Sequence, residues 1–234
     1  MIPVATIFHW DLPQPLQDIG GWNNPALVGY FVNYSRIVIR DLPKVGYWIT
    51  INEPKQICRR GYGVGDFAPG VHRDGIGEYL CAYVVVKCHA AVYHMYKETF
   101  PEFTVIIDRV KYRSKNENLT KSRLPKFTQE EIDYINGTFD FMGFNTYWTY
   151  LVSDIEEPKF GDPSYLSDIR ANISVDPSWS VAPNGNTIVP WGARKILKWV
   201  KSTYNDPSIF ITENGVADDG STTTDTERIN FLTV

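Results

Sequence analysis

The sequence has 234 residues, of which 43% are hydrophobic and 14% aromatic, and its 23 basic and 27 acidic side chains give a formal net charge of −4. This apolar content excludes a disordered chain, because it is enough to bury a core. The small negative charge gives no electrostatic footprint for nucleic acid or for an anionic membrane. No apolar run approaches the ~20 residues that a membrane-spanning helix needs. We therefore expect neither a nucleic-acid partner nor a membrane partner.

The cysteines and histidines predict neither a disulfide framework nor a metal site. Cys58 stands alone in the sequence, and Cys81 and Cys88 are two helix turns apart in a helical stretch, ~10 Å along the axis and beyond disulfide reach. His89 and His94 lie on different faces of the same predicted helix, so they do not have metal-ligand spacing. We expect no metal and no cofactor.

The first half of the chain alternates between patterns typical of strands and of helices. Asn24 and Pro25 supply an N-cap and a first-turn proline for one helix. An apolar stripe at helical spacing marks a second, longer helix, and apolar runs that end in polar residues predict the strands. The expected elements are strands over 3–9 and 47–51 and helices over 27–38 and 76–95.

The second half repeats this alternation. Thr128 with Glu131, and Thr224 with Glu227, have the spacing of capping boxes, in which two side chains reciprocally bond the backbone N–H groups at a helix start. The expected elements are helices over 128–136 and 194–204, strands over 139–147 and 209–212, and a helix that begins near 224.

The links between these elements differ in length according to their direction. Links from helix to strand are short, whereas links from strand to helix are long, over 10–23, 54–75 and 150–192. Long connections at the carboxyl ends of strands carry the active site in parallel α/β proteins, both barrels and open sheets. The pattern therefore predicts an α/β fold, and loop length by itself does not distinguish a barrel from an open sheet.

Two of the predicted strands end in the same way. Glu53 and Glu213 each follow an apolar run that contains a threonine, and each stands beside an asparagine. A carboxylate is costly on a buried strand unless it is paired, hydrogen-bonded or functional. One such glutamate is more often a solvated strand end, but two at the same edge of one sheet favour a joint role.

Two carboxylates on either side of one bond suit glycoside hydrolysis. Repulsion between like charges keeps one carboxyl protonated and the other ionised. The acid then protonates the leaving oxygen, and the carboxylate attacks the anomeric carbon. Trp10, Trp148 and Trp191 near the strand ends suit stacking on sugar rings, although core packing is the commoner role of any single tryptophan.

These residues resemble the family 1 glycoside hydrolases, the β-glucosidase-like enzymes with a (β/α)8 TIM barrel, and insect members most of all. The motifs occur in the family's order over nearly the whole chain, and the paired N-E-P and T-E-N-G are highly specific. The matching pieces are Phe8-His9-Trp10-Asp11-Leu12-Pro13, Gly20-Gly21-Trp22, Thr50-Ile51-Asn52-Glu53-Pro54, Ser122-Arg123-Leu124-Pro125, Phe144-Asn145-Thr146-Tyr147, Pro190-Trp191-Gly192 and Ile211-Thr212-Glu213-Asn214-Gly215.

The resemblance implies a retaining β-glycoside hydrolase in which Glu53 is the acid/base and Glu213 the nucleophile. Retention requires carboxyl groups ~5–5.5 Å apart. Plant thioglucosidases of the family replace the acid/base by glutamine, so Glu53 favours hydrolysis of ordinary O-glycosides. The substrate-binding residues that the resemblance implies are His9, Trp10, Asn52, Asn145 and Tyr147. Among these, Asn52 would hold the sugar 2-hydroxyl and Tyr147 would hydrogen-bond the nucleophile.

The chain also departs from the family's pattern. It resembles a single partial domain over 1–234, an incomplete TIM barrel with strands equivalent to the third, fourth, sixth and seventh and a deletion junction near 100–108. Two strand pairs separated by a gap cannot close a barrel. We therefore expect the fragment to be unstable or inactive by itself. Asn184-Gly185-Asn186 stands where the family often has an aromatic residue of the aglycone site.

Two other functions compete with hydrolysis. The first is a non-catalytic sugar-binding remnant, a pseudoenzyme that keeps the motifs with half of the subsite. The second takes the glycines Gly61, Gly63 and Gly65 as a phosphate cradle, although the sequence lacks the Lys-Ser/Thr of a P-loop. The residues give no oligomeric state.

The compartment follows only from the resemblance. No signal peptide is visible at the start of the chain, whereas full-length relatives of this family suggest a secreted, extracellular protein. Four Asn-x-Ser/Thr sites point weakly the same way: Asn33, Asn118, Asn136 and Asn172.

Overall fold

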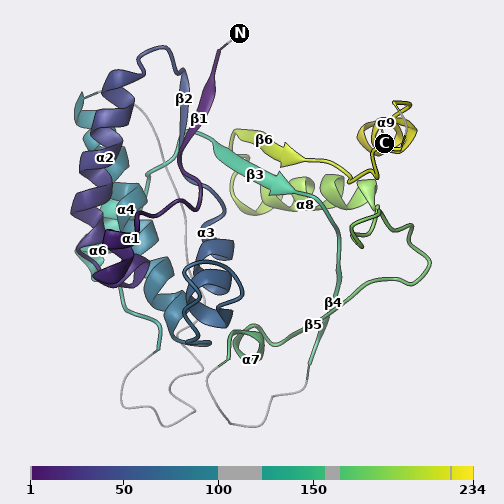
Figure 1. Cartoon of the computed structure of the whole chain (residues 1–234), viewed down its shortest axis with the longest axis horizontal. Helices are drawn as coiled ribbons and strands as arrows, with labels where there is room; N and C mark the ends of the chain where they lie inside the picture. The colour runs from purple at the N-terminus through teal and green to yellow at the C-terminus, as the bar shows by residue number, and fades with distance from the viewer. Residues whose placement is uncertain (1, 100–122, 156–163, 222, 234) are drawn as a thin grey trace. The chain divides into compact units, whose positions relative to one another are not determined.

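The computed structural model describes residues 2–99, 123–155, 164–221 and 223–233 (Figure 1). The chain divides into two compact units. Unit 1 consists of residues 1–140 and 158–169, and unit 2 consists of residues 141–157 and 170–234. Each unit is described by itself below.

The described residues of unit 1 form one parallel pair of strands and several helices. Its elements are β1 (Val4–Phe8), α1 (Gln14–Asp18), η1 (Gly21–Asn23), α2 (Leu27–Asp41), β2 (Tyr47–Ile51), α3 (Pro54–Gln56), the π-helix η2 (Ile57–Val64), α4 (Gly77–Thr99), α6 (Gln129–Ile135) and α7 (Tyr165–Ile169).

Over the part of unit 2 that the structure describes, there are a second parallel pair, an antiparallel pair and two helices. Its elements are β3 (Met142–Thr146), β4 (Leu151–Asp154), β5 (Ala171–Ser174), α8 (Pro190–Thr203), β6 (Ile209–Asn214) and α9 (Thr226–Leu232). None of the helices in the described ranges is both long enough and apolar enough to cross a membrane.

The predicted strand pairs are confirmed. β1 lies parallel to β2, with Val4 opposite Tyr47 and Phe8 opposite Ile51. β3 lies parallel to β6, and the register shifts after Phe144, so that Asn145 is opposite Glu213. Among the described residues each of these sheets has two strands. Parallel strands need long crossover connections, which the intervening helices provide.

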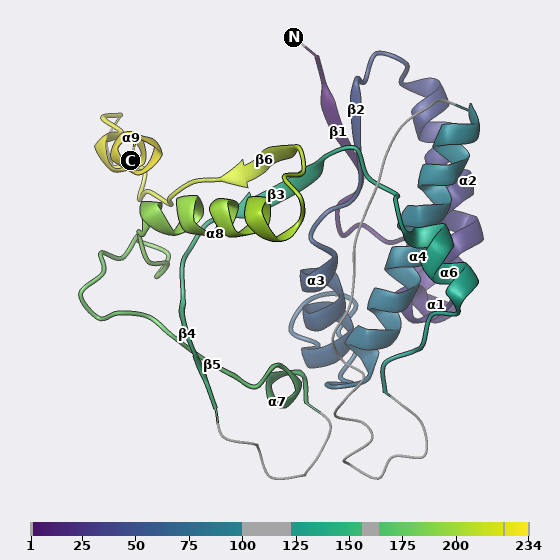
Figure 2. The ribbon, with the colours of Figure 1, turned by 180° about the vertical axis from the view of Figure 1, so that it is seen from behind.

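The core of the molecule lies in unit 1, where α2 and α6 both pack against α4 (Figures 1 and 2). Leu27 and Phe31 on α2 and Val84 on α4 are at most 5% exposed. Trp22 from η1 joins them and contacts the rings of Phe8 and Phe31. This aromatic cluster packs directly beneath the end of β1, so it supports the residues that follow that strand.

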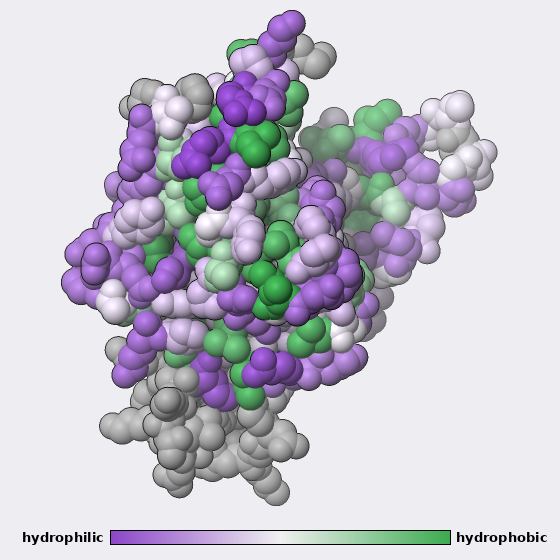
Figure 3. All heavy atoms as spheres, turned by 60° about the vertical axis from the view of Figure 1, so that its left-hand side comes forward, coloured by the Kyte–Doolittle hydropathy of each residue, from purple (hydrophilic) through white to green (hydrophobic). Residues whose placement is uncertain are grey.

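Unit 2 covers its strands less completely. Phe210 and Ile211 on β6 are 40% and 48% exposed. Neighbouring residues of a strand point to opposite faces, so both faces of β6 are partly uncovered. Figure 3 shows one face of the molecule, on which hydrophobic residues interrupt the hydrophilic surface. The exposure at β6 agrees with the expectation that an open barrel loses packing partners.

The helix starts were predicted with mixed success. The capping box of Thr128 and Glu131 is confirmed, and both of its hydrogen bonds are present. The one at Thr224 is wrong, because α9 begins at Thr226 with Asp225 at the N-cap and without a side-chain cap. Asn24 forms a turn by accepting a bond from Ala26 N–H at 2.9 Å, and α2 begins only at Leu27.

Two predictions about loops and cysteines are wrong. Cys58 is not alone: it forms a disulfide with Cys81, because η2 folds back onto α4 across a separation of 23 residues. The predicted loop over 150–192 contains the antiparallel pair β4–β5. Alternation was not visible in these strands, since seven of their eight residues are exposed.

The glycines proposed as a phosphate cradle have a packing role. Gly61 and Gly63 lie in η2, not in an open loop. A Cβ atom at Gly61 would lie 2.8 Å from the carbonyl oxygen of Ala68, and one at Gly63 would lie 2.9 Å from a carboxylate oxygen of Glu78. Close approach of neighbouring groups therefore explains why these positions are glycine.

Candidate active site

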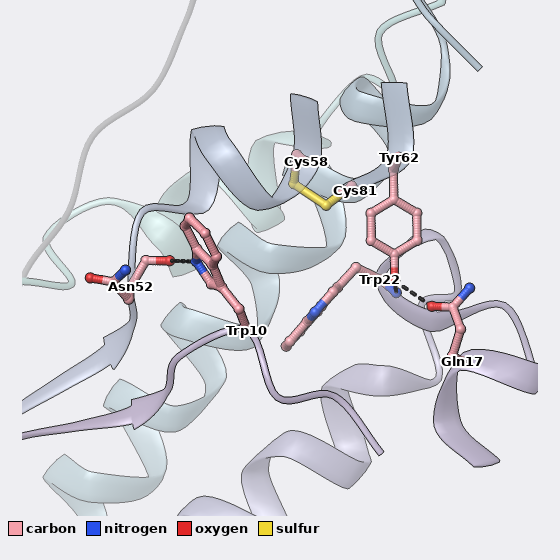
Figure 4. Close-up of a disulfide and its surroundings, with 7 residues drawn as sticks. All are labelled: Trp10, Gln17, Trp22, Asn52, Cys58, Tyr62 and Cys81. Carbon is pink, nitrogen blue, oxygen red and sulfur yellow. Dashed lines mark hydrogen bonds between the residues drawn. A yellow bond between two sulfur atoms is a disulfide. The ribbon is translucent and has the colours of Figure 1, made fainter. Parts of the chain in front are cut away.

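The polar residues after β1 and β2 come together at one end of that sheet. Asn52 Nδ2 donates to His9 Nε2 at 3.1 Å, and Trp10 Nε1 donates to the carbonyl oxygen of Asn52 at 3.1 Å (Figure 4). The backbone supports this, because Asn52 N–H donates to Phe8 C=O at 3.0 Å. Both the backbone N–H and the backbone C=O of Asn52 are therefore hydrogen-bonded, and the residue is 8% exposed.

Two of these residues have an unusual backbone. Trp10 has φ 73° and Glu53 has φ 43°, each at the point where its strand ends. Positive φ is uncommon for residues other than glycine, and it concentrates at functional sites where the surrounding structure imposes it. Sequence patterns do not reveal it here, because neither tryptophan nor glutamate favours this conformation.

Glu53 also marks the start of a helical run. It is the N-cap of α3, with Pro54 in the first turn, and α3 passes directly into η2. The structure therefore places Glu53 between the carboxyl end of β2 and the amino end of the run 54–64. Movement of that run would move the Glu53 backbone.

In unit 2 the predicted residues gather at the carboxyl ends of β3 and β6. Tyr147 Oη donates to Glu213 Oε2 at 2.6 Å. One position earlier on β6, Thr212 Oγ1 donates to Asn145 Oδ1 at 2.7 Å. The register shift after Phe144 sets Asn145 opposite Glu213. The Glu213 carboxylate therefore has the Tyr147 phenol as a hydrogen-bond donor, which holds it in one orientation.

A cavity of about 390 Å³ opens beside these residues in unit 2. Tyr147 and Asn214, the neighbours of Glu213, form part of its wall, and the rest combines asparagine, threonine, arginine and apolar residues. Its other lining residues are Ala182, Asn184, Asn186, Thr187, Ile188, Gly215, Val216, Ala217, Arg228, Phe231 and Leu232. Amides, a threonine and apolar residues in one wall suit a hydroxylated ligand, and the one arginine there, Arg228, is paired with Asp218 and Asp225.

The three tryptophans considered for stacking lie at the surface. Trp10, Trp148 and Trp191 are 38%, 40% and 39% exposed, respectively. Trp10 contacts the ring of Phe67, and Trp191 contacts that of Trp179. Core packing therefore does not account for these side chains. Within the described ranges, no three His, Cys, Asp or Glu side chains gather as a metal site would require.

A half-buried histidine holds the strand that leads to Glu53. His89 on α4 lies between Thr50 Oγ1 of β2, 2.6 Å from Nδ1, and the carbonyl oxygen of Thr138, 2.7 Å from Nε2. The carbonyl can only accept, so Nε2 carries the proton and Nδ1 accepts from the threonine hydroxyl. Burial lowers the pKa of His89 below its usual 6.5, so the ring is neutral in this role.

We expect the substitution His89→Gln to remove part of the pH dependence of folding. Below pH 6.5, and down to the lowered pKa of the folded state, the unfolded chain binds a proton that the folded chain does not. The free energy of unfolding then falls by up to about 1.4 kcal/mol per pH unit, so this stability is full above pH 6.5 and is lost as the pH falls. Glutamine can make both hydrogen bonds without titrating. The free energy of unfolding, measured with urea at several pH values in this range, should fall more steeply with decreasing pH for the wild type than for the variant.

The control for this measurement is His94→Gln on the same helix. His94 Nε2 bonds the carbonyl oxygen of Tyr134 at an exposed position. This variant should follow the wild-type pH profile. Equal slopes for the wild type and His89→Gln would show that His89 is not the titrating group.

The two glutamates lie on different units. Glu53 follows β2 in unit 1, and Glu213 lies on β6 in unit 2. The structure brings together His9, Trp10 and Asn52 beside Glu53, and separately Asn145 and Tyr147 beside Glu213. Their convergence across one substrate stays a prediction.

Comparison with known proteins identifies the family. The family described as "Glycosyl hydrolase family 1" matches residues 1–114 and 103–234. Human lactase/phlorizin hydrolase is 36% identical over 99% of the chain and 14% of its own length. Myrosinase 1 of Brevicoryne brassicae is 33% identical over 99% of the chain and 60% of its own length.

Solved structures give the same result. An aphid myrosinase superimposes with a TM-score of 0.86 at 31% identity, over 99% of the chain and 60% of that protein. A rice β-glucosidase, Os3BGlu6, superimposes with a TM-score of 0.84 at 25% identity, over 99% of the chain and 62% of that protein. The chain thus spans about three fifths of the length of these proteins, and its fold is an incomplete TIM barrel. The chain belongs to glycosyl hydrolase family 1.

Proposed function

We propose that this chain carries the catalytic pair of a retaining β-glycosidase that acts on a small β-glucoside-like substrate. Protonated Glu53 donates its proton to the glycosidic oxygen while the Glu213 carboxylate attacks the anomeric carbon. The aglycone leaves as an alcohol, and the sugar becomes an ester of Glu213. Glu53 then takes a proton from water, which attacks the same carbon and frees both the sugar and Glu213.

The observation that carries this proposal is the hydrogen bond from Tyr147 Oη to Glu213 Oε2 at the carboxyl end of β6. A nucleophilic carboxylate must be correctly oriented, and the Tyr147 phenol holds the orientation of the Glu213 carboxylate. In unit 1, hydrogen bonds with His9 and Trp10 hold Asn52 in place, so its side-chain amide is available to bind the sugar. It would donate to a sugar hydroxyl next to the anomeric carbon, with His9 and Trp10 contacting the ring further along.

The relatives support the chemistry. One structure of the rice β-glucosidase Os3BGlu6 is of a mutant in a covalent complex with Glc, as a mechanism with a sugar ester requires. Myrosinase and β-glucosidases both occur among the relatives. The presence of glutamate at position 53 favours O-glycosides over thioglycosides for this chain.

We also propose that an internal segment of the barrel is missing near residues 100–108. The family matches the chain in two segments, 1–114 and 103–234, rather than in one. Alignments with three relatives run over 278–285 positions, more than the 234 residues of the chain. They therefore contain gaps on the side of this chain. The fragment should be far less active than a complete barrel.

The second candidate function is a sugar-binding remnant without turnover. The exposure of Phe210 and Ile211 on both faces of β6 favours it, because loosely packed strands hold a catalytic carboxylate less rigidly. The cavity beside Tyr147 would still accept a hydroxylated ligand.

Covalent trapping separates these functions. A 2-deoxy-2-fluoro-β-glucoside with a good leaving group should glycosylate Glu213, since fluorine slows hydrolysis of the ester more than it prevents its formation. Intact mass would show one added sugar, and peptide mapping would place it at Glu213. Binding of the reagent without an adduct would support the remnant, and an adduct on another residue would contradict the proposed nucleophile.

A further inference from the structure

The disulfide between Cys58 and Cys81 cross-links two helical elements that follow one another in the chain. Cys58 lies in η2 and Cys81 in α4, and their Cα atoms are 5.3 Å apart (Figure 4). Both residues are buried, at 2% and 0% exposure. The third cysteine, Cys88, is a free, buried thiol whose pKa is raised to about 12 by burial. Of the three cysteines, Cys58 and Cys81 are therefore the two that form the disulfide in the native core.

The disulfide lies close to Glu53 along the chain. The helical run of α3 and η2 extends from Pro54 to Val64, and Cys58 is near its amino end. Glu53 is the residue on which this run begins, and it is held at a positive φ of 43°. A backbone held in an uncommon conformation needs the surrounding structure to impose it. Cross-linking Cys58 to α4 supplies such a constraint one helical turn away.

The far end of the same run is held by a different device. Tyr62 Oη accepts a bond from Trp22 N–H at 3.0 Å and donates to Gln17 Oε1 at 2.6 Å (Figure 4). Tyr62 is 1% exposed. Hydrogen bonds thus attach the last turn of η2 to η1 and α1, whereas the disulfide attaches the beginning of η2 to α4. The beginning is the part that adjoins Glu53.

We propose that the Cys58–Cys81 disulfide is a positioning device for Glu53, so that unit 1 acquires its working geometry only where thiols are oxidised. In that step the two thiols lose two protons and two electrons to a disulfide of an oxidant, which leaves as two thiols. The inference rests on the proposed function for the acid/base role of Glu53. It also places maturation of the chain in an oxidising compartment, in agreement with the expectation of a secreted protein.

The first test needs no enzymatic activity. The protein, denatured without reductant, should take up one thiol label, on Cys88, and three labels after reduction. Hydrogen exchange should then compare the native protein with the double variant Cys58→Ala/Cys81→Ala. We expect the backbone amides within residues 53–57, where Pro54 has none, to exchange at least about tenfold faster in the variant, while the amides of β3 and β6 keep their rates.

Two controls keep this test decisive. Cys88→Ala removes a buried cysteine of the same helix α4 without touching the disulfide, and it should leave exchange at 53–57 unchanged. Wild-type protein treated with a phosphine reductant provides the reduced state without mutation, in case the double variant does not fold. Three labels without reduction, or equal exchange at 53–57 with and without the bond, would overturn the proposal.

A second test measures how loss of the disulfide affects proton donation by Glu53. A 2,4-dinitrophenyl β-glucoside needs no proton for its leaving group, whereas an alkyl β-glucoside does. Loss of the disulfide should lower kcat on the alkyl substrate by about 10- to 100-fold and on the dinitrophenyl substrate by less than threefold, or ~0.65 kcal/mol. Equal losses on both would mean a purely structural role and would overturn positioning. If the unmodified protein hydrolyses neither glucoside, the proposed function fails for this chain, and the exchange result still decides the role of the disulfide.

Discussion

Replacing Glu213 by glutamine should abolish the hydrolysis of β-glucosides, with kcat/KM lower by at least about 10⁴-fold, equivalent to ~5.4 kcal/mol of transition-state stabilisation. A neutral amide can still accept the hydrogen bond from Tyr147, but it cannot form the sugar ester through which the reaction passes. Steady-state hydrolysis of 4-nitrophenyl β-glucoside measures the loss. Binding of a glucose-like inhibitor should be nearly unchanged.

The matched control is Glu227→Gln, which removes the same charge from an exposed position of α9 in the same unit. This variant should retain the wild-type rate. If the Glu213→Gln protein keeps more than about 1% of the wild-type activity, this residual activity is well above the expected level. The nucleophile then lies elsewhere.

Glu53→Gln should act differently, because glutamine cannot donate a proton to a leaving group. Hydrolysis of an alkyl β-glucoside should fall by about 10²- to 10⁴-fold, while formation of the sugar ester from a dinitrophenyl glucoside should hardly change. This dependence on the leaving group is the signature of an acid/base residue, and it separates Glu53 from the nucleophile. The loss of activity in Glu53→Gln also sets the upper limit for the loss of activity that breaking the Cys58–Cys81 disulfide can cause through Glu53.

Much of the architecture could be predicted because local patterns carry it. The apolar runs that end in Glu53 and Glu213 have the lengths of strands, and the resemblance to the family implied the pairing of β1 with β2 and of β3 with β6, which the structure confirms. The two glutamates could be named because a matching pair of them stands at strand ends, and the other candidate residues could be named because the motifs around them resemble those of the family.

The features that escaped prediction depend on contacts distant in sequence. No local pattern shows that Cys58 meets Cys81, since the meeting depends on how η2 folds back onto α4. The positive φ angles of Trp10 and Glu53 likewise arise from the surroundings and not from residue type. The strands β4 and β5 lack a buried face, so the alternation that marks a strand is absent from their sequences.

Completing the barrel should raise the activity of this chain by at least about 10³-fold, within the range that alignment of catalytic groups can provide. The described residues form two parallel pairs, and a TIM barrel closes only with eight strands. A chimera would supply, from Myrosinase 1 of Brevicoryne brassicae, the segments that have no counterpart in this chain, including one inserted near residues 100–108. Its added strands would bury the exposed faces of β6 at Phe210 and Ile211 and hold Glu53 and Glu213 across one substrate.

The chimera should therefore melt cooperatively at a higher temperature as well as hydrolyse 4-nitrophenyl β-glucoside faster. The same chimera with Glu213→Gln controls for activity contributed by the grafted segments, and it should be inactive although equally stable. If the 234-residue chain by itself is monomeric, melts cooperatively and matches the chimera in rate, then four strands are sufficient to bring the two carboxylates together. In that case the proposed loss of activity and stability through the missing strands is wrong. Two separate sheets would then have brought the carboxyl groups to the ~5–5.5 Å spacing that retention requires without a closed barrel.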